Sequence, residues 1–387
     1  MDSASHPMAL MAERVRDAAH SSKPLRICGG GSKNFYGQAL GGDVLDMRDH
    51  CGVISYEPSE LVVTVRGGTK LAELEALLAE QGQCLPFEPP HFGPHATVGG
   101  MVASGLSGPA RASSGAVRDF LLGVVLLNGR GECLTFGGQV MKNVAGYDVS
   151  RLMAGTLGTL GVLLEISLKV LPMAPAEATL MCSGLPQQKA LDLLNRWGAQ
   201  PLPLNASCWV HDDTAAPAQD FLFVRLRGAV AAVGAACPRM MSDVQAAGGQ
   251  AVQMDNSQSG ADWIACREQS LPFFAQPPSL DDCLWRLSVP QTTPAMDLPY
   301  APFIEWHGGL RWLWAPASAA AQLRGLAAQA GGHATLFRRP ARTSAELPAD
   351  LSVFTPLTPV QSRIQRELKQ QFDPAGVFNP HRMSLDW

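Results

Sequence analysis

The sequence predicts an α+β protein of two domains, and three observations predict this fold class. The chain has 387 residues, which at about 150 residues per domain is enough for two or three domains. Strand-like and helix-like stretches in the second half follow one another in an order that suggests an antiparallel sheet with helices on one face. Glycine-rich turns gather in the first half, whereas a looser, proline-punctuated composition begins after Pro172. We therefore expect a first domain over residues 1–172, a smaller α+β domain with an antiparallel sheet over 173–350, and a C-terminal segment over 351–387.

The first half of the first domain is expected to contain two strands and a helix. The apolar run that starts at Leu25 predicts a strand that enters a tight turn of three glycines and Ser32. Residues 61–66 (LVVTVR) predict a second strand. The helix that follows is expected to have Thr69 as its N-cap and Gly82 as the residue that ends it.

The second half of this domain predicts a loop followed by three strands. Residues 89–110 carry no formal charge and contain too many Pro and Gly residues for a long helix, so we expect a loop with a short helix. Residues 120–127 and 132–136 are expected to pair as a hairpin, because the Asn-Gly pair between them favours a type I′ turn. Residues 161–170 alternate as a third strand.

The second domain gives weaker signals. Its sequence predicts strands over residues 221–226, 283–289 and 310–314, and helices over residues 229–247 and 317–329. This order of elements predicts an antiparallel sheet with helices on one face. A short basic helix and the motif FDPAGVFNPHRM follow in the C-terminal segment.

Composition and charge exclude several classes of protein. The hydrophobic fraction of 46% and the charged fraction of 17% argue against disorder. A net charge of −4 gives no overall attraction for nucleic acid or anionic lipid. The nine cysteines contain no CxxC pair, and their odd number fits reduced thiols that pack as small core residues. No secretory signal and no apolar run of about 18 residues is found, so we expect a cytoplasmic protein without a membrane span.

The motifs in the chain point away from the best-known nucleotide and hydrolase sites. There is no GxGxxG, GxxxxGK[ST], HExxH or GxSxG, which excludes Rossmann and P-loop sites among others. Four glycine-rich turns remain, beginning near Gly29, Thr97, Ser104 and Gly155. Glycine lets backbone N–H groups approach a pyrophosphate closely, so a dinucleotide site is favoured over four ordinary β-turns.

The order of these motifs resembles a known family. The phrases GGGSK, ATVGGMVASGLSG, GAVRDFLLGV and KNVAGYDVSRLMAGTLGTLGV follow one another as in the FAD-binding domain of the vanillyl-alcohol oxidase and p-cresol methylhydroxylase type. The whole chain, with its short second domain and FDPAGVFNPHRM, resembles the FAD-binding subunits of bacterial glycolate oxidases. The resemblance implies a two-part FAD-binding domain, a cap domain and FAD as the cofactor.

The resemblance also implies which residues contact FAD. Residues 29–33 would hold the pyrophosphate, residues 159–162 would close over the adenine, and Asn379 would return from the C-terminal segment toward the flavin. The residues assigned to the cofactor are Gly29, Gly30, Gly31, Ser32, Lys33, His95, Thr97, Gly99, Gly100, Ser104, Ser107, Thr159, Gly161, Val162 and Asn379.

Three positions depart from the pattern of the family. Leu157 stands where relatives commonly carry Glu, so a polar contact is expected to be missing. Ser114 replaces a usual Tyr, and Lys33 follows the serine where small polar residues are common. The charge of Lys33 would help to neutralise a phosphate, with a plainly exposed lysine as the alternative.

Catalytic residues are harder to assign. Dehydrogenation of a 2-hydroxy acid needs a base for the hydroxyl proton and a cation for the carboxylate. The candidates are Glu305, His307 and Arg311 in IEWHGGLRW, with His381 and Arg382 near the C-terminus. For each of these residues, the alternative to a catalytic role is that the side chain is packed and only supports the structure. The sequence contains no pattern of metal ligands, so we expect no metal site.

The resemblance implies partners and leaves three functions open. In the family, such a subunit works beside a larger FAD-containing sibling and an iron–sulfur subunit, and any contact with the inner membrane is made through partners. The chain is expected either to oxidise glycolate, and D-lactate as a related substrate, or to serve as a non-catalytic assembly or electron-relay subunit. A flavoenzyme for another substrate is the third reading. Trp306, Trp312 and Trp314 would line a subunit interface or pack in the core.

Overall fold

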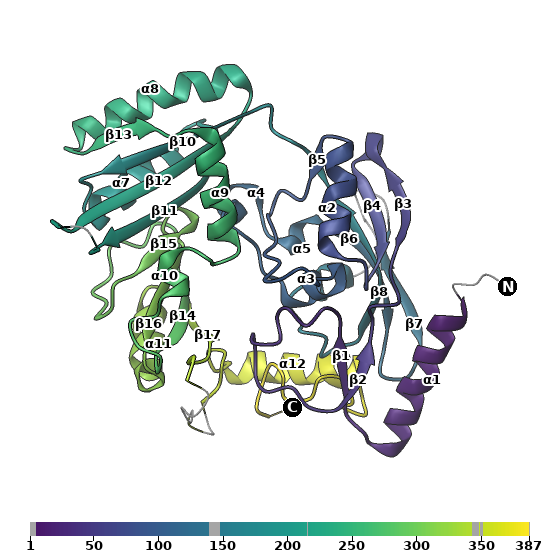
Figure 1. Ribbon diagram of the computed structural model, residues 1–387. Coiled ribbons are helices and arrows are strands. Elements are labelled where there is room, and N and C mark those ends of the chain that lie inside the picture. The colour runs from purple at the N-terminus through teal and green to yellow at the C-terminus, as the bar shows by residue number, and fades with distance from the viewer. Residues whose placement is uncertain (1–4, 139–147, 215, 343–347, 349–350, 387) are drawn as a thin grey trace. The chain divides into compact units, whose positions relative to one another are not determined.

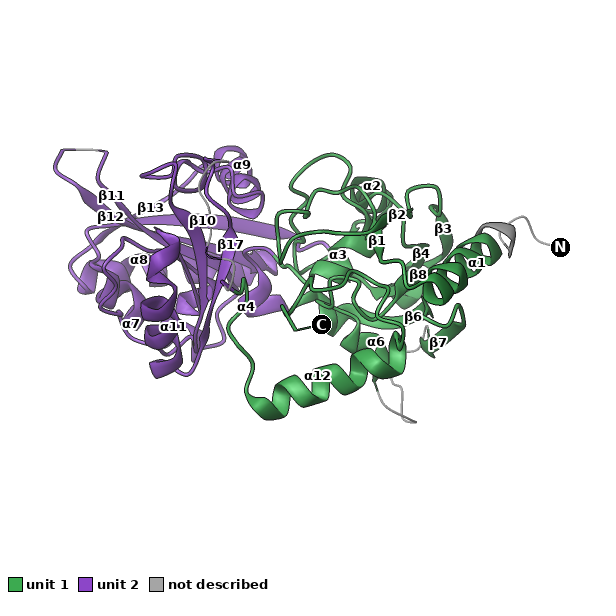
Figure 2. Ribbon diagram, turned by 90° about the horizontal axis from the view of Figure 1, so that it is seen from below, with its two compact units in different colours: residues 1–107, 116–172, 352–387 green, residues 108–115, 173–351 purple. Residues whose placement is uncertain are grey.

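The computed structural model divides the chain into two compact units (Figure 2). It describes residues 5–138, 148–214, 216–342, 348 and 351–386. Unit 1 consists of residues 1–107, 116–172 and 352–387, and unit 2 of residues 108–115 and 173–351. Neither unit is continuous in sequence. The short segment 108–115, expected within the first domain, packs in unit 2, and the C-terminal segment packs in unit 1.

Unit 1 is built on a five-stranded antiparallel sheet with strand order β3-β4-β8-β6-β7. The five strands are β3 (Val53–Glu57), β4 (Val62–Arg66), β6 (Leu121–Leu127), β7 (Cys133–Gly137) and β8 (Val162–Lys169). Two small sheets accompany it, a parallel pair of β1 (Leu25–Cys28) with β2 (Asp43–Asp46) and an antiparallel pair of β5 (Gln83–Cys84) with β9 (Leu171–Pro172). The expected strands of the first domain are therefore present.

Helices cover the main sheet of unit 1 (Figure 1). They are α1 (Ser5–Ser21), α2 (Leu71–Glu80), α3 (Val98–Ser104), α5 (Val117–Phe120), α6 (Val149–Leu152) and α12 (Pro359–Phe372), with a 3₁₀ turn over Pro58–Glu60. One core joins α2 and α3 to the sheet through residues such as Leu74, Met101 and Ile166. A second core joins α1 and β1 to Val377 and Phe378 of the C-terminal segment.

Two local expectations for unit 1 are wrong. Thr69 is not the N-cap of α2, because the helix begins after Lys70. The hydroxyl of Thr69 instead donates to the carbonyl of Arg66 at 2.7 Å and accepts from the N–H of Gly52 at 3.0 Å. The hairpin of β6 and β7 has no type I′ turn. Its five-residue loop is closed by Asn128, whose Oδ1 accepts hydrogen bonds from the N–H groups of Arg130 and Glu132, and the positive φ falls on Gly131.

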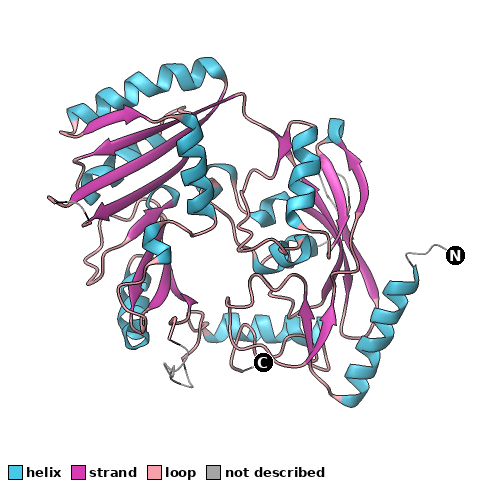
Figure 3. Ribbon diagram, viewed as in Figure 1, coloured by secondary structure: helices cyan, strands magenta, loops and turns pink. Residues whose placement is uncertain are grey.

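Unit 2 contains an eight-stranded sheet in which all neighbouring strands are antiparallel (Figure 3). The strand order is β13-β10-β12-β11-β15-β16-β14-β17. The strands are β10 (Ala176–Ser183), β11 (Leu204–Asp212), β12 (Gln219–Gly228), β13 (Gln250–Gln253), β14 (Cys283–Ser288), β15 (Phe303–Glu305), β16 (Leu310–Ala315) and β17 (His333–Arg338). The predicted antiparallel sheet is confirmed, although several of its strands were not foreseen.

The helices of unit 2 lie on both faces of this sheet, not on one. They are α4 (Arg111–Ser114), α7 (Gln187–Gly198), α8 (Val230–Ala246), α9 (Asn256–Arg267), α10 (Pro272–Ala275) and α11 (Ala320–Gln329), with 3₁₀ turns η2 (Trp306–Gly308) and η3 (Ala317–Ala319). Leu180 and Cys182 of β10 pack with α7 and α8. Thr179, which directly precedes Leu180 on β10, points to the opposite face of the sheet, where its hydroxyl accepts a hydrogen bond from Trp263 of α9.

The cysteines form no disulfide bonds. All nine cysteines are free thiols, and five of them are buried. Among the residues that the structure describes, no group of His, Cys, Asp and Glu side chains is arranged to hold a metal ion. No helix within the described ranges has the length and apolar character to cross a membrane.

Candidate functional site

A pocket in unit 1 brings together residues from four separate stretches of the chain. It lies at the end of β1, where the strand enters the glycine-rich turn. The lining residues are Ile27, Cys28, Gly29, Gly30, Gly31, Ser32, Lys33, Asn34, Leu40, Thr97, Gly100, Ala103, Ser104, Leu157, Asn379 and Arg382. Nine of the fifteen residues expected to contact FAD are among them.

The glycine-rich turn presents unpaired backbone donors to this pocket. Among the described residues, no acceptor is found for the backbone N–H groups of Gly30, Gly31 and Ser32. Gly31 has φ +73°, a left-handed conformation that lets successive N–H groups converge. The Lys33 ammonium lies 3.4 Å from Ser32 Oγ and donates to the carbonyl of His91 at 3.1 Å. This donor set fits the phosphate oxygens of a dinucleotide.

Two of these glycines are also required by close packing. A Cβ on Gly30 would lie 1.4 Å from the carbonyl oxygen of His95, and a Cβ on Gly29 would lie 2.3 Å from Thr97 Oγ1. Any side chain at either position would therefore push the turn away from the segment that precedes α3. The absence of side chains keeps both the turn and the pocket in their shape.

Helix α3 forms a second wall of the pocket through Gly100, Ala103 and Ser104. Thr97 caps this helix, because its Oγ1 accepts a hydrogen bond from the N–H of Gly100 at 3.2 Å. Gly99 does not line the pocket but packs against Gly67. Its N–H donates to the carbonyl of Gly67 at 2.8 Å, and a Cβ would contact that same oxygen.

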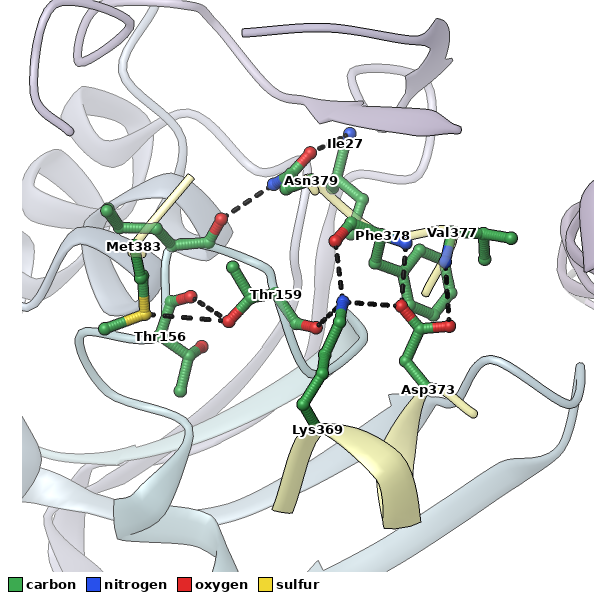
Figure 4. A network of polar contacts seen from close by, with 10 residues as sticks. Ile27, Thr156, Thr159, Lys369, Asp373, Val377, Phe378, Asn379 and Met383 are labelled. Atoms are coloured by element: carbon green, nitrogen blue, oxygen red, sulfur yellow. Dashed lines mark hydrogen bonds and ion pairs between the residues drawn. The ribbon is translucent and has the colours of Figure 1, made fainter. Parts of the chain in front are cut away.

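The C-terminal segment provides a third wall, and Asn379 fixes its position (Figure 4). The side-chain oxygen of Asn379 accepts a hydrogen bond from the N–H of Ile27 at 2.9 Å, and its Nδ2 donates to the carbonyl of Leu157 at 2.7 Å. Its backbone N–H donates to Leu25. One side chain thus ties the segment to β1 and to the loop before β8.

A buried ion pair anchors the same segment from below (Figure 4). Lys369, in the last turn of α12, donates to Asp373 at 2.6 Å and to the carbonyls of Thr159 and Phe378 at 2.8 and 2.9 Å. Asp373 in turn accepts from the N–H groups of Val377 and Phe378. Burial lowers the pKa of Lys369, an effect that the charge of Asp373 opposes. The ammonium of Lys369 thus makes three hydrogen bonds, and both oxygens of the Asp373 carboxylate accept hydrogen bonds, so neither charge is buried without partners.

Arg382 stabilises the far side of the glycine-rich turn. Its buried guanidinium donates to the carbonyls of Asn34, Tyr36 and Gln38, and so holds the loop that follows Ser32 in one conformation. His381, the neighbouring candidate, is exposed, and its ring lies 3.1 Å from the carbonyl oxygen of Leu385. The structure therefore gives Arg382 a supporting place in the candidate pocket, and it places His381 outside it.

Six of the residues expected to contact FAD lie outside this pocket. His95 packs against the glycine-rich turn and Gly99 against Gly67. Ser107 accepts a hydrogen bond from the N–H of Val117, and Thr159 bonds Thr156 and Lys369. Val162 is the first residue of β8, and Gly161 directly precedes it. Leu157, the departure from the family pattern, lines the pocket with φ +50°. Of the phrase KNVAGYD, residues 142–147 lie outside the described part of the chain.

The catalytic candidates in unit 2 are buried and have protein partners. The carboxylate of Glu305 accepts hydrogen bonds from Trp312 Nε1 at 2.6 Å and from the thiol of Cys266 at 3.3 Å. His307 lies between two serines, with Ser207 Oγ 2.8 Å from Nδ1 and Ser113 Oγ 2.9 Å from Nε2. Burial lowers the pKa of His307 to about 4, so its imidazole is neutral at pH 7.

Arg311 is fully buried and binds backbone oxygens. Its Nη2 donates to the carbonyls of Thr293 and Pro294 at 2.7 and 2.8 Å. Burial lowers its pKa to about 10. Trp306 and Trp312 are also buried, so both pack in the core of unit 2. The sequence analysis gave a packed structural role as the alternative to catalysis for these residues, and all of these contacts fit that structural role.

The structure adds pocket residues that the sequence did not indicate. Cys28, Asn34, Leu40 and Ala103 line the pocket without belonging to any motif singled out above. Proximity to the GGGSK phrase was the available signal for Cys28 and Asn34. No sequence signal distinguished Leu40 or Ala103, because apolar and small residues are common throughout the chain.

Comparison with a protein-family model supports the assignment of the pocket. Residues 8–137 match the family model described as "FAD binding domain". This range contains the glycine-rich turn and α3, and therefore two of the three walls of the pocket.

Known proteins resemble the chain over different lengths. It is 28% identical over 189 residues to the glycolate oxidase subunit GlcD of Bacillus subtilis (strain 168), which covers 46% of this chain and 40% of that protein. It is 31% identical over 157 residues to the mitochondrial cytochrome-type D-lactate dehydrogenase of Arabidopsis thaliana, which covers 40% of this chain and 27% of that protein. A solved structure of alkyldihydroxyacetonephosphate synthase matches with a TM-score of 0.66 at 15% identity, over 96% of this chain and 74% of that one, and shows a shared fold.

One relative matches nearly end to end. The chain is 46% identical over 371 residues to the glycolate oxidase subunit GlcE of Escherichia coli (strain K12), and the match covers 96% of this chain and 95% of the relative. The chain thus belongs to the GlcE family of glycolate oxidase subunits, and it is an FAD-binding oxidoreductase subunit.

Proposed function

We propose that this chain is the FAD-carrying subunit of a complex that oxidises glycolate, and D-lactate as a related substrate, to the 2-oxo acid. The identity of 46% to a glycolate oxidase subunit over almost the full chain carries this proposal. The similarity of part of the chain to a D-lactate dehydrogenase supports the second substrate. In the proposal a larger FAD-containing sibling and an iron–sulfur subunit complete the complex, in the cytoplasm or held at the inner membrane by these partners.

The chain's own residues would hold FAD in the pocket of unit 1. The N–H groups of Gly30, Gly31 and Ser32 would donate to the pyrophosphate, and the ammonium of Lys33 would offset part of its charge. Asn379 and Arg382 would keep the surrounding segments in place. Bound FAD supplies the electron acceptor for oxidation of the alcohol.

A second function is favoured by one observation in unit 2. Glu305, His307 and Arg311 are all buried, and each is engaged by protein groups. A general base must reach the substrate hydroxyl, which these side chains do not do in this conformation. The alternative proposal is therefore an assembly or electron-relay subunit that binds FAD while its sibling turns over the substrate.

Flavin absorbance distinguishes the two functions. The chain is produced alone and together with its partner subunits, and the visible flavin spectrum is recorded before and after anaerobic addition of glycolate. Bleaching in the isolated chain supports its own substrate turnover. Flavin that bleaches only in the complex supports the relay function. Absence of flavin from both preparations contradicts the proposed FAD site.

A further inference from the structure

A half-buried arginine in unit 2 has no acceptor for its charged head. Arg286 lies on β14, directly across from Trp312 on β16. Within residues 5–138, 148–214, 216–342, 348 and 351–386, no carboxylate or carbonyl oxygen makes an ion pair or hydrogen bond with its guanidinium. A guanidinium carries five N–H donors in a planar fork. None of its nitrogens is among the fully buried polar atoms that lack a partner, so the fork is open to solvent or to a ligand.

Two tryptophan rings lie beside this guanidinium. The central carbon of the Arg286 guanidinium lies 5.1 Å from the ring centroid of Trp306 and 5.9 Å from that of Trp312. Both indoles are buried and fixed by their own hydrogen bonds, Trp306 to the carbonyl of Gly108 and Trp312 to Glu305. Stacking uses the faces of a guanidinium and leaves its N–H edge available for an anion.

A second arginine contacts one of the same tryptophans. A second guanidinium, that of Arg111 on α4, lies 4.5 Å from the ring centroid of the same Trp306. The charge of Arg286 also contributes to lowering the pKa of His333, after the larger effect of burial. The carboxylate of Glu305 accepts a hydrogen bond from the indole N–H of Trp312. An anion that approached Arg286 would therefore meet its guanidinium and the two indole rings.

We propose that Arg286 binds the carboxylate of a small 2-hydroxy acid, with Trp306 and Trp312 as the walls that orient the guanidinium. The planar fork of an arginine matches a carboxylate in two parallel hydrogen bonds. Indole faces beside the fork suit the short carbon chain of such an acid. The choice of ligand rests on the proposed function, whereas the site itself rests on the geometry around Arg286. Neither Arg286 nor Arg111 was recognised in the sequence.

The binding of oxalate tests this site without oxidation of the ligand. Oxalate has carboxylates but no C–H bond to oxidise, so calorimetric titration of the full FAD-containing chain reports binding alone. We expect saturable binding that weakens at least tenfold in R286M and less in R286K, which keeps the charge but not the fork. The control is R196M, because Arg196 is exposed on α7 and forms an ion pair with Asp243. Circular dichroism melting confirms that each variant is folded.

Three results overturn the inference. The first is that oxalate shows no saturable binding to the wild-type chain. The second is that the wild type and R286M bind oxalate with equal affinity. The third is that inorganic phosphate displaces oxalate as effectively as glycolate does. In the reconstituted complex, R286M should raise the glycolate KM more than it lowers kcat. Flavin content measured on the same samples tests the proposed function separately. Loss of flavin with intact oxalate binding contradicts that function and leaves the site at Arg286 standing.

Discussion

The side-chain oxygen of Asn379 accepts a hydrogen bond from the backbone N–H of Ile27, a residue 352 positions earlier in the chain. The other end of the same amide donates to Leu157. The three segments that meet here all line the candidate FAD pocket. A single amide therefore fixes the separation of pocket walls that the sequence leaves hundreds of residues apart.

Replacement of Asn379 by Asp should weaken FAD retention. The carboxylate still accepts from Ile27, but it turns an oxygen instead of a donor toward the carbonyl of Leu157. Loss of this buried hydrogen bond should cost about 1–3 kcal/mol of stability in unit 1. We expect a lower flavin content after purification and a lower melting temperature, measured by absorbance at 450 nm and by thermal denaturation.

The matched control for this variant is Asn256→Asp. Asn256 also donates through its side chain to a backbone carbonyl, that of Glu177, but it is exposed and belongs to unit 2. Its flavin content should equal that of the wild type. If both Asp variants lose flavin alike, the Asn379 contacts have no special part in holding the pocket.

A methyl group at Gly30 should abolish the pocket. The added Cβ would lie 1.4 Å from the carbonyl of His95, and two backbone segments would have to separate to admit it. We expect Gly30→Ala to be purified without flavin and to be destabilised in denaturant. Gly41→Ala is the control, because nothing lies within 4 Å of its Cβ and its φ is not positive. Normal flavin content in Gly30→Ala would show that the turn does not contact the cofactor.

Local sequence patterns predicted the strands of unit 1 well, because strand formation there depends on short-range features of the chain. The β-branched run of β4 and the alternation of β8 are short-range signals that survive in the fold. The turn after β6 was mispredicted because Asn128 can close a longer loop through its side chain as readily as it enters a type I′ turn. Helix α9 was not predicted, because its apolar residues do not gather strongly on one face and its partners lie on strands that are distant in the sequence.

The candidate site was only partly predictable for a similar reason. Glycines mark a phosphate-binding turn within a few residues, so residues 29–33 could be named from sequence. The supporting contacts of Lys369 and Arg382 reach residues more than 200 positions away, and no local pattern encodes them. Arg286 looked like one strand residue among many, because its significance depends on two tryptophans from other elements and on the acceptors that it lacks.

Acid should destabilise unit 2 through His307. Burial lowers the pKa of its imidazole from 6.5 to about 4, so the unfolded chain binds a proton between these pH values that the folded unit does not. Stability is therefore unaffected by this group above pH 6.5 and falls as the pH drops from 6.5 to 4. The pKa difference corresponds to about 3 kcal/mol.

Urea denaturation at several pH values between 7 and 4 measures this effect. In the variant His307→Gln, the loss of stability over this range should be smaller than in the wild type by about 3 kcal/mol. The control is His20→Gln, because His20 is exposed on α1 and belongs to unit 1, so its replacement should not change the stability of unit 2. Identical pH profiles for the wild type and His307→Gln would contradict a buried neutral imidazole.

Thiol labelling should locate the cofactor without any measurement of activity. Cys28 is half-buried and lines the pocket, whereas the half-buried Cys84 on β5 does not. Bound FAD should therefore slow alkylation of Cys28 several-fold relative to the flavin-free chain, and leave Cys84 unchanged, as read by peptide mass spectrometry over time. Cys182, whose pKa burial raises to about 12, should resist labelling in both samples. Equal rates at Cys28 with and without flavin would place the cofactor away from the end of β1.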